Sequence, residues 1–317
     1  MTNVAQKLNV GQVARLQAEE AQSFSPFRVA LRRFLKHRMA VVGTIIITFI
    51  LLFVIGGAFF TTETQGNKTN IMNKEKAPTS ESPFGTDLVG RDVFTRMIWG
   101  GQISIAIGIV SVVISISVGT LVGVVSGYFG GWVDSLLSRI TEALLAIPVL
   151  ILLLVLSTVL SQSSVKTTIL GRELSSTVVI IILLIGFTSW MTLARIVRAQ
   201  VLSLKEQEFV MAARAIGVTD QHMILQHLLP NLIAPIVVTA TLGIGTAIIT
   251  EAYLSFLGFG VQPPTATWGN ILTGAQDKID RVWWLWAAPG FFIVLTVLAI
   301  NFIGDGLRDA LDPRSIR

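Results

Sequence analysis

The chain has 317 residues, of which 52% are hydrophobic and 14% are charged, and its formal net charge is +5. So large an apolar share is untypical of a soluble domain of this length and predicts an integral membrane protein. The chain contains no cysteine, which excludes disulfides and thiolate chemistry. The basic residues do not alternate with an aromatic platform, so no nucleic-acid partner is expected.

The N-terminal region, residues 1–37, is predicted to be a cytoplasmic tail with a basic amphipathic segment. In this segment Arg28, Arg32 and Arg33 oppose apolar residues, a pattern typical of a helix lying on a membrane surface. A plain positively charged anchor explains the same residues equally well. Because the first apolar run begins near Met39 and is long enough to span a membrane, no cleavable signal peptide is predicted.

Six runs without Asp, Glu, Lys or Arg are each long enough to hold the roughly 20 apolar residues that cross a bilayer core. They cover residues 39–62, 97–133, 143–165, 174–194, 221–250 and 282–304. We therefore predict an all-α membrane protein with six transmembrane helices. In the second run, Gly108, Ser111, Ser115 and Gly119 recur at three- and four-residue steps, which predicts close packing against another helix.

Six transmembrane helices place both termini on one side of the membrane. With the N-terminus inside, fifteen Lys and Arg residues lie on the inner side and nine on the outer side, which favours cytoplasmic N- and C-termini. The resulting regions are the tail at 1–37, a first transmembrane helix at 38–62, an outer loop at 63–97, a five-helix core at 98–304 and a cytoplasmic tail at 305–317. The loop 195–231 within the core then lies in the cytoplasm.

Residues 208–231 form a polar, helix-compatible island inside this apolar chain. We expect two short amphipathic helices that meet at Gly217, the second capped by Thr219 or Asp220. The apolar stripe of the first contains Phe209, Ala212, Ala213 and Ile216, and that of the second contains Ile224, Leu225, Leu228 and Leu229. Such a knob is suited to a groove of another protein. An ordinary amphipathic connector is the alternative.

This segment resembles the cytoplasmic coupling loop of ATP-binding-cassette (ABC) importer permeases. The family pattern is Glu-Ala-Ala, three residues, Gly, nine residues, then Ile-x-Leu-Pro. The matching positions here are Ala212, Ala213, Gly217, Leu229 and Pro230, which the resemblance implies to be the ATPase-coupling residues. Met211 replaces the glutamate and His227 replaces the isoleucine, so that Met211 cannot form the ion pair of a glutamate, and the glycine hinge is kept.

Four further stretches agree with the resemblance. Residues 82–94, 127–134, 254–270 and 304–314 are similar to the second, C-type permease subunit of the dipeptide/oligopeptide/nickel subfamily. The resemblance covers about residues 25–317. It implies a type I ABC importer permease (MetI-like) core in the last five helices, preceded by an extra N-terminal helix beside a partner permease.

The function that the resemblance implies is that of a permease subunit in an ATP-driven peptide importer. The chain has no Gly-x-x-x-x-Gly-Lys-Ser/Thr sequence, so ATP must be hydrolysed by other subunits. The implied partners are a homologous permease, two ATPase subunits and an extracytoplasmic substrate-binding protein, in the plasma (inner) membrane of a prokaryote. We expect no catalytic residues, no metal ligands and no cofactor in this chain.

Other substrates and another class of transporter remain as alternatives. Nickel complexes and glycosides are carried by similar permeases. A secondary transporter driven by an ion gradient would need buried carboxylates or broken helices near the middle of the membrane. Glu251, which follows the fifth apolar run, is the one candidate carboxylate of this kind. It either lines the translocation path or packs at the interface against the loop that follows it.

Overall fold

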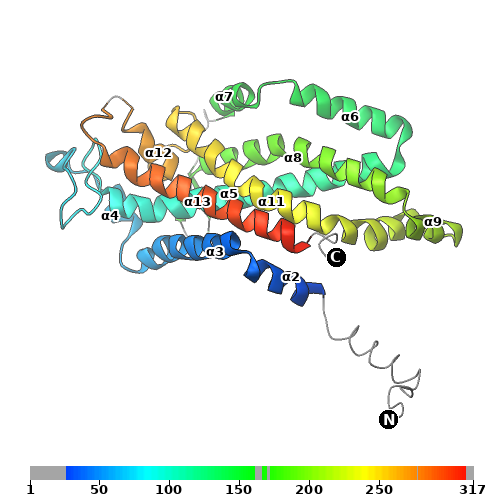
Figure 1. The fold of residues 1–317 in the computed structure, drawn as a ribbon. Coiled ribbons are helices and arrows are strands. Elements are labelled where there is room, and N and C mark those ends of the chain that lie inside the picture. The colour runs from blue at the N-terminus through cyan, green and yellow to red at the C-terminus, as the bar shows by residue number, and fades with distance from the viewer. Residues whose placement is uncertain (1–25, 161–165, 170–171, 277, 312–317) are drawn as a thin grey trace, which may run out of the picture.

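The structure is a computed structural model that describes residues 26–160, 166–169, 172–276 and 278–311. Figure 1 shows the long helices α5, α8, α11 and α13 running side by side, with α3 along one flank and α6 along the other. The helices are α2 Pro26–Lys36, α3 Arg38–Leu51, α4 Glu63–Asn67, α5 Val93–Phe129, α6 Gly131–Leu145, α7 Val149–Leu160, α8 Ser176–Lys205, α9 Glu208–Ala215, α10 Asp220–His222, α11 Leu229–Phe256, α12 Trp268–Thr273 and α13 Trp284–Leu311. Shorter turns are η1 Leu52–Gly56, η2 Gly57–Phe59, η3 Ile71–Asn73 and η4 Met223–Leu228, and strands β1 Lys166–Ile169 and β2 Arg172–Ser175 pair antiparallel.

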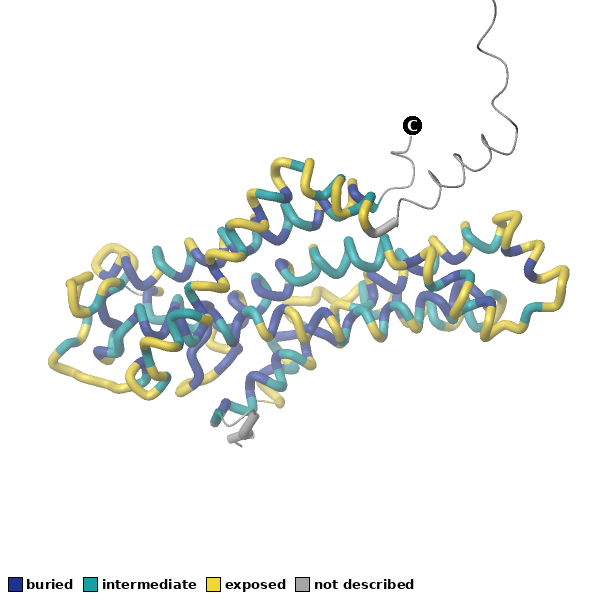
Figure 2. Tube along the Cα trace, turned by 90° about the horizontal axis from the view of Figure 1, so that it is seen from below, coloured by how far each residue is buried: buried dark blue, intermediate teal, exposed yellow. Residues whose placement is uncertain are grey.

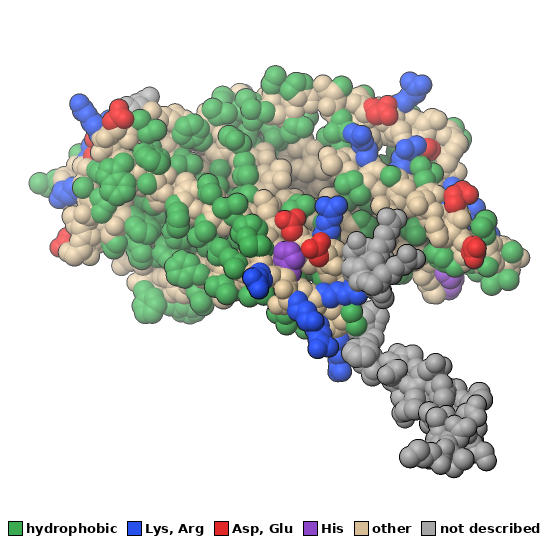
Figure 3. Space-filling view, viewed as in Figure 1, with side chains coloured by type: hydrophobic (Ala, Val, Ile, Leu, Met, Phe, Trp, Pro, Cys, Tyr) green, Lys and Arg blue, Asp and Glu red, His purple; other side chains and the backbone are tan. Residues whose placement is uncertain are grey.

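The helices are long and apolar enough to cross a membrane, as the sequence predicts. Among the described residues, five segments pass this test, and the bent pair α6–α7 is a sixth when it counts as one span. The five are Arg38–Phe59, Val93–Phe129, Ser176–Lys205, Asp220–Phe256 and Trp284–Leu311. The hydrocarbon core of a membrane offers no hydrogen-bond partner for backbone N–H and C=O groups. A helix meets this constraint because its backbone groups bond to one another. Hydrophobic side chains cover much of the face in Figure 3, and charged ones gather at its two ends and around α2.

The predicted third span, 143–165, is wrong as a single straight helix. Helix α6 ends at Leu145, α7 begins at Val149, and the two are bent by 82°. Pro148 lies at the break, and its ring disfavours helical backbone angles at Ile147. The search for runs without charged residues does not detect this bend, because proline is uncharged and does not interrupt such a run. Residues 161–165 lie outside the described part of the chain.

The extra N-terminal helix α3 packs along α13. The two backbones approach closely, since a Cβ placed on Gly43 would lie 2.6 Å from the Ala299 carbonyl oxygen. Ile45 and Phe49 on α3 are exposed. The expectation that this helix lies beside a partner permease stays a prediction, and these side chains are available for such a contact or for lipid.

Helices α5 and α8 form the most extensive helix contact in the core. A Cβ on Gly119 would lie 2.8 Å from the Trp190 carbonyl oxygen, and one on Gly123 would lie 2.6 Å from that of Ala194. Real side chains do not approach backbone so closely, so glycine is required here. The predicted packing role of Gly119 is confirmed, and the same contact continues at Gly123.

Helix α12 closes one end of the bundle, which we call the α12 end. Trp268 is fully buried there, and its indole Nε1 donates to the Met97 carbonyl at 3.0 Å. Figure 2 shows buried residues along the central helices and exposed residues in the loops at the two ends. The other end, where α9 lies, carries the segment that the sequence singles out.

We expect Gly123→Ala to lower the free energy of unfolding by about 1–3 kcal/mol, because its methyl group would meet the Ala194 backbone. Thermal unfolding of the purified protein in detergent measures the change. Gly290→Ala is the control, since a Cβ at that helical position has no atom within 4 Å and should be neutral or stabilising. Equal melting temperatures for the two variants would contradict the packing argument.

Candidate functional site

Helix α9 is a short helix with a well-defined end. Glu208 lies in its first turn and Arg214 in its last, which suits the partial charges at helix ends. Gly217 follows with φ +81°, a left-handed conformation that favours glycine. The amide of Gly217 donates to the Arg214 carbonyl at 3.0 Å, and that of Val218 donates to the Ala213 carbonyl at 3.1 Å. These two bonds make a Schellman motif, so the predicted hinge at Gly217 is confirmed as a turn.

The second predicted short helix is wrong as a separate element. From Asp220 the chain runs through α10, η4 and α11 as one helical segment that ends at Phe256. Pro230 lacks an amide hydrogen and lies in the first turn of α11, where the π-helical turn η4 precedes it. A locally widened turn accommodates the missing bond without ending the helix, so the sequence pattern at proline misleads about the boundary.

The predicted cap of this segment is also wrong. Thr219 precedes α10 but makes no side-chain capping bond. The Asp220 carboxylate accepts a hydrogen bond from the hydroxyl of Tyr128 at the end of α5. Asp220 therefore binds Tyr128, which is distant in the sequence, and does not cap the helix as the local sequence pattern predicts.

The predicted coupling residues divide between the inside and the outside of the α9 end. Ala213 is buried with Val210, Met223 and Leu228 in one apolar cluster. Of the other predicted positions, Leu229 is half-buried, and Ala212, Gly217 and Pro230 are exposed. The five predicted coupling residues therefore do not share one environment.

The remaining apolar side chains of the α9 segment point outward. Phe209 is 42% exposed, Met211 is 51% exposed and Ile216 is 82% exposed. Val210 and Ala213 anchor the helix from its opposite side. The segment thus holds its own position and still presents an apolar surface next to the Gly217 turn.

Four side chains that the sequence analysis did not single out as a group join α9 to the transmembrane helices. We call Tyr128, Lys205, Arg214 and Asp220 the Tyr128 junction. Lys205 at the end of α8 donates to the carbonyls of Gly127 and Tyr128 at 3.2 and 2.8 Å. These carbonyls lie in the last turn of α5, where helix geometry leaves them without intrahelical partners.

The Tyr128 ring completes the Tyr128 junction. The Arg214 guanidinium lies 5.6 Å from the ring centroid, and Lys205 Nζ lies 5.9 Å from it, so both cations face an aromatic π-system. The hydroxyl binds Asp220. Tyr128 and Asp220 are 92 positions apart, so no local pattern predicts the contact. The ends of α5 and α8 and the start of the long α10–α11 segment therefore meet at α9.

Glu251 lies far from α9, near the α12 end. It is 0% exposed and accepts hydrogen bonds from Ser104 at 3.2 Å and Ser255 at 2.6 Å. The Ser104 hydroxyl also accepts from the amide of Trp268, in the segment after the α11–α12 loop. This placement matches the alternative in which Glu251 packs against the following loop. Its role in a translocation path stays a prediction.

Two of the three histidines lie close together. His222 and His227 lie with ring centroids 5.9 Å apart. Across the described residues, no group of three or more His, Cys, Asp or Glu side chains is arranged to hold a metal ion. At α9, charged and aromatic side chains join the helix ends.

We expect Tyr128→Phe to weaken the attachment of α9 by about 1 kcal/mol, because it removes the hydrogen bond to Asp220. Amide hydrogen exchange in residues 208–216 should then speed up about fivefold. The control is Tyr253→Phe, which changes the only other tyrosine of the chain, an exposed one. An unchanged exchange rate in Tyr128→Phe would show that the Tyr128 hydroxyl does not help to attach α9.

Comparison with known proteins identifies the family. Residues 119–317 match the family model described as binding-protein-dependent transport system inner membrane component, and residues 25–78 match the N-terminal transmembrane domain of oligopeptide transport permease C. The dipeptide transport system permease protein of Alkalihalophilus pseudofirmus is 40% identical over 93% of this chain and 92% of its own length. The oligopeptide transport system permease protein of Bacillus subtilis is 37% identical over 92% of this chain and 91% of its own.

A solved structure supports the fold. The methionine ABC transporter MetNI, in an inward-facing conformation, aligns with a TM-score of 0.53 and 22% identity over 68% of this chain and 96% of that one. At this identity the match shows the shared fold, and it agrees with the predicted type I importer core. From the family models and the full-length relatives, the chain belongs to the family of binding-protein-dependent transport system inner membrane components.

Proposed function

We propose that this chain is a permease subunit of an ATP-driven peptide importer. The observation that carries the proposal is the near full-length similarity to permeases named for dipeptide and oligopeptide transport. The exposed apolar surface of α9, held by the Tyr128 junction, supports it from the structure. Nickel and glycosides remain alternative substrates within the same family, and the names of these relatives favour peptides.

The α9 segment is the proposed contact with an ATPase subunit. Phe209, Met211 and Ile216 offer apolar side chains for a groove in that partner, in the manner of a short helix bound by its exposed face. Ala212, Gly217 and Pro230 border this surface, while Ala213 and Leu229 set its position from inside. The predicted coupling residues thus divide into contact and support.

Movement of the ATPases is transmitted through the Tyr128 junction in this proposal. Closure of the ATPase pair on ATP shifts α9, and Lys205 and Asp220 connect that shift to the ends of α8 and of the α10–α11 segment. Rigid helices carry it across the membrane, so that the cavity between the two permeases opens outward. The chain contributes no bond-making chemistry in this scheme.

The proposed assembly contains this chain, a homologous permease, two ATPases and an extracytoplasmic substrate-binding protein. The cytoplasmic tails at 1–37 and 305–317 and the coupling loop share one side, because Lys and Arg are more numerous there. The outer loop 63–97 and the α12 end face the binding protein from the other side. The family's dependence on a binding protein supports this arrangement.

We expect Ile216→Asp to reduce the recovery of ATPase subunits with the purified permease at least tenfold, because it places a charge in an apolar contact. Pull-down of the tagged chain in mild detergent measures the recovery. Ile71→Asp is the matched control, since Ile71 is 80% exposed but lies in the loop 63–97. If both variants retain the ATPases as the native chain does, α9 is not the contact.

Uptake in vesicles tests the function itself. We expect vesicles that contain the assembled complex to accumulate labelled peptide in the presence of the binding protein only when ATP is enclosed with the ATPase subunits inside the vesicles. An ionophore that dissipates ion gradients should leave this uptake unchanged. Uptake that requires an ion gradient and no ATP would replace the proposal with the ion-coupled alternative.

A further inference from the structure

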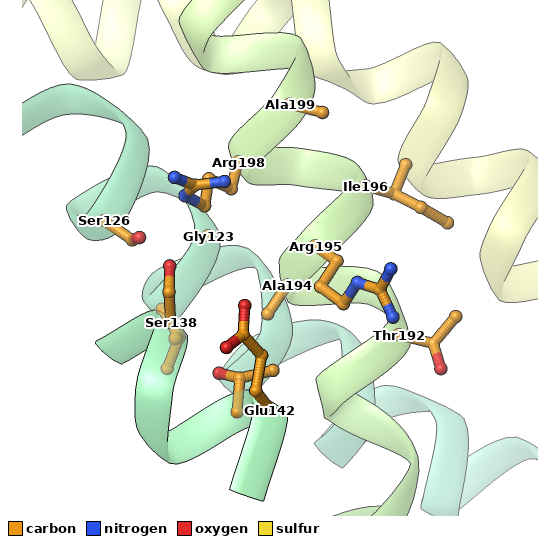
Figure 4. Close-up of a pocket in the computed structure, with 12 residues that line it drawn as sticks. Gly123, Ser126, Ser138, Glu142, Thr192, Ala194, Arg195, Ile196, Arg198 and Ala199 are labelled. Carbon is orange, nitrogen blue, oxygen red and sulfur yellow. The ribbon is translucent and has the colours of Figure 1, made fainter. Parts of the chain in front are cut away.

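A cleft with a mixed polar and apolar lining lies between α5, α6 and α8, a few turns from the α9 end. Its volume is about 600 Å³, within the range of pockets that hold small ligands. Figure 4 shows that its walls come from these three helices and that charged side chains from α6 and α8 border the space. The three charged residues that line it are Glu142, Arg195 and Arg198.

One of these charges is already neutralised. The Arg198 guanidinium binds the Asp134 carboxylate through two bonds, Nε to Oδ1 at 2.5 Å and Nη2 to Oδ2 at 2.7 Å. Asp134 also accepts from Ser126 and Ser138. This group ties α6 to α5 and α8 and forms a structural wall of the cleft.

The other two charges have no such partners. Glu142 on α6 and Arg195 on α8 are exposed, and neither side chain makes a hydrogen bond or a salt bridge within the part of the chain that the structure describes. Glu142 has a longer-range attraction to Arg198, which Asp134 already binds. In Figure 4 both side chains border the same space from facing helices. Charges within membrane-spanning elements are costly unless they face water or a ligand.

We infer that this cleft is a transit subsite for a short zwitterionic peptide, whose ammonium group faces Glu142 and whose carboxylate faces Arg195. The inference rests on the proposed function. One free anion and one free cation match the two ends of such a peptide, whereas a ligand of a single sign leaves one charge unmatched. The guanidinium fork is suited to a carboxylate.

The rest of the lining fits a ligand of variable sequence. Gly123, Ala194 and Ala199 have small side chains or none, which leaves room for the peptide's own side chains. Thr192 offers a hydroxyl that makes no hydrogen bond within the described residues. The cleft thus recognises the two termini that all unmodified peptides share.

The test measures equilibrium binding to the assembled importer in nanodiscs, without its binding protein. The probes are labelled dialanine, N-acetyl-dialanine and dialanine amide. For the native complex we expect acetylation and amidation each to weaken binding at least tenfold. Glu142→Gln should abolish the effect of acetylation and keep that of amidation, and Arg195→Gln should do the reverse.

Arg139→Gln is the control, because Arg139 is an exposed residue of α6 that does not line the cleft. It should preserve both effects. The comparison uses ratios between probes within one preparation, so a partly unfolded variant does not mimic the expected result.

Three outcomes overturn the inference: equal binding of all three probes to the native complex, ratios that neither variant alters, or no dialanine binding because a partner helix fills the cleft. Each is separate from failure of the proposed function, which is read from ATP-dependent peptide uptake in vesicles containing the complete native assembly. If that uptake occurs and the binding ratios between probes are the same in the native complex and in the variants at residues 142 and 195, the proposed function stands and the subsite is rejected.

Discussion

The close contact between α5 and α8 is the constraint on which the α9 end depends. Gly123 lies against the Ala194 carbonyl, and the same register continues toward the last turns of both helices. Lys205 therefore reaches the final carbonyls of α5, and Tyr128 comes within reach of Asp220 and Arg214. A larger residue at one glycine would shift all of these contacts together, because rigid helices transmit a local displacement along their length.

The same register also positions the charged groups within the bundle. Asp134 and Arg198 bind each other, and the fully buried Glu251 accepts hydrogen bonds from two serine hydroxyls. Low polarity makes an unpaired buried charge expensive, so complete pairing is the expected pattern. Glu142 and Arg195 are instead exposed at the cleft, and their side chains make no hydrogen bond or salt bridge among the described residues. This is why we assign them to the binding of a transported ligand.

The sequence predicts those features that local chemistry determines. Charge-free runs locate the transmembrane helices because hydrocarbon excludes charges, and glycine at 217 marks a left-handed turn that other residues adopt at a cost. The bend at Pro148 and the continuity of the helix past Pro230 escape prediction, because proline ends a helix in one context and is accommodated in another. The Tyr128 junction and the contact of Glu251 with Ser104 join distant segments, for which one sequence carries no signal.

The unbroken helical segment from Asp220 to Phe256 gives the protein a direct link between its two faces. Its 37 residues extend about 55 Å at 1.5 Å per residue, enough to cross a bilayer and project beyond it. One end begins beside the Gly217 turn, and the other carries the Glu251 hydroxyl network under the α12 end. The π-helical turn η4 lies near the first of these ends. In the proposed coupling, a displacement of α9 would reach the opposite face through this one helical segment, with the η4 turn near α9 and the Glu251 hydrogen bonds at the far end.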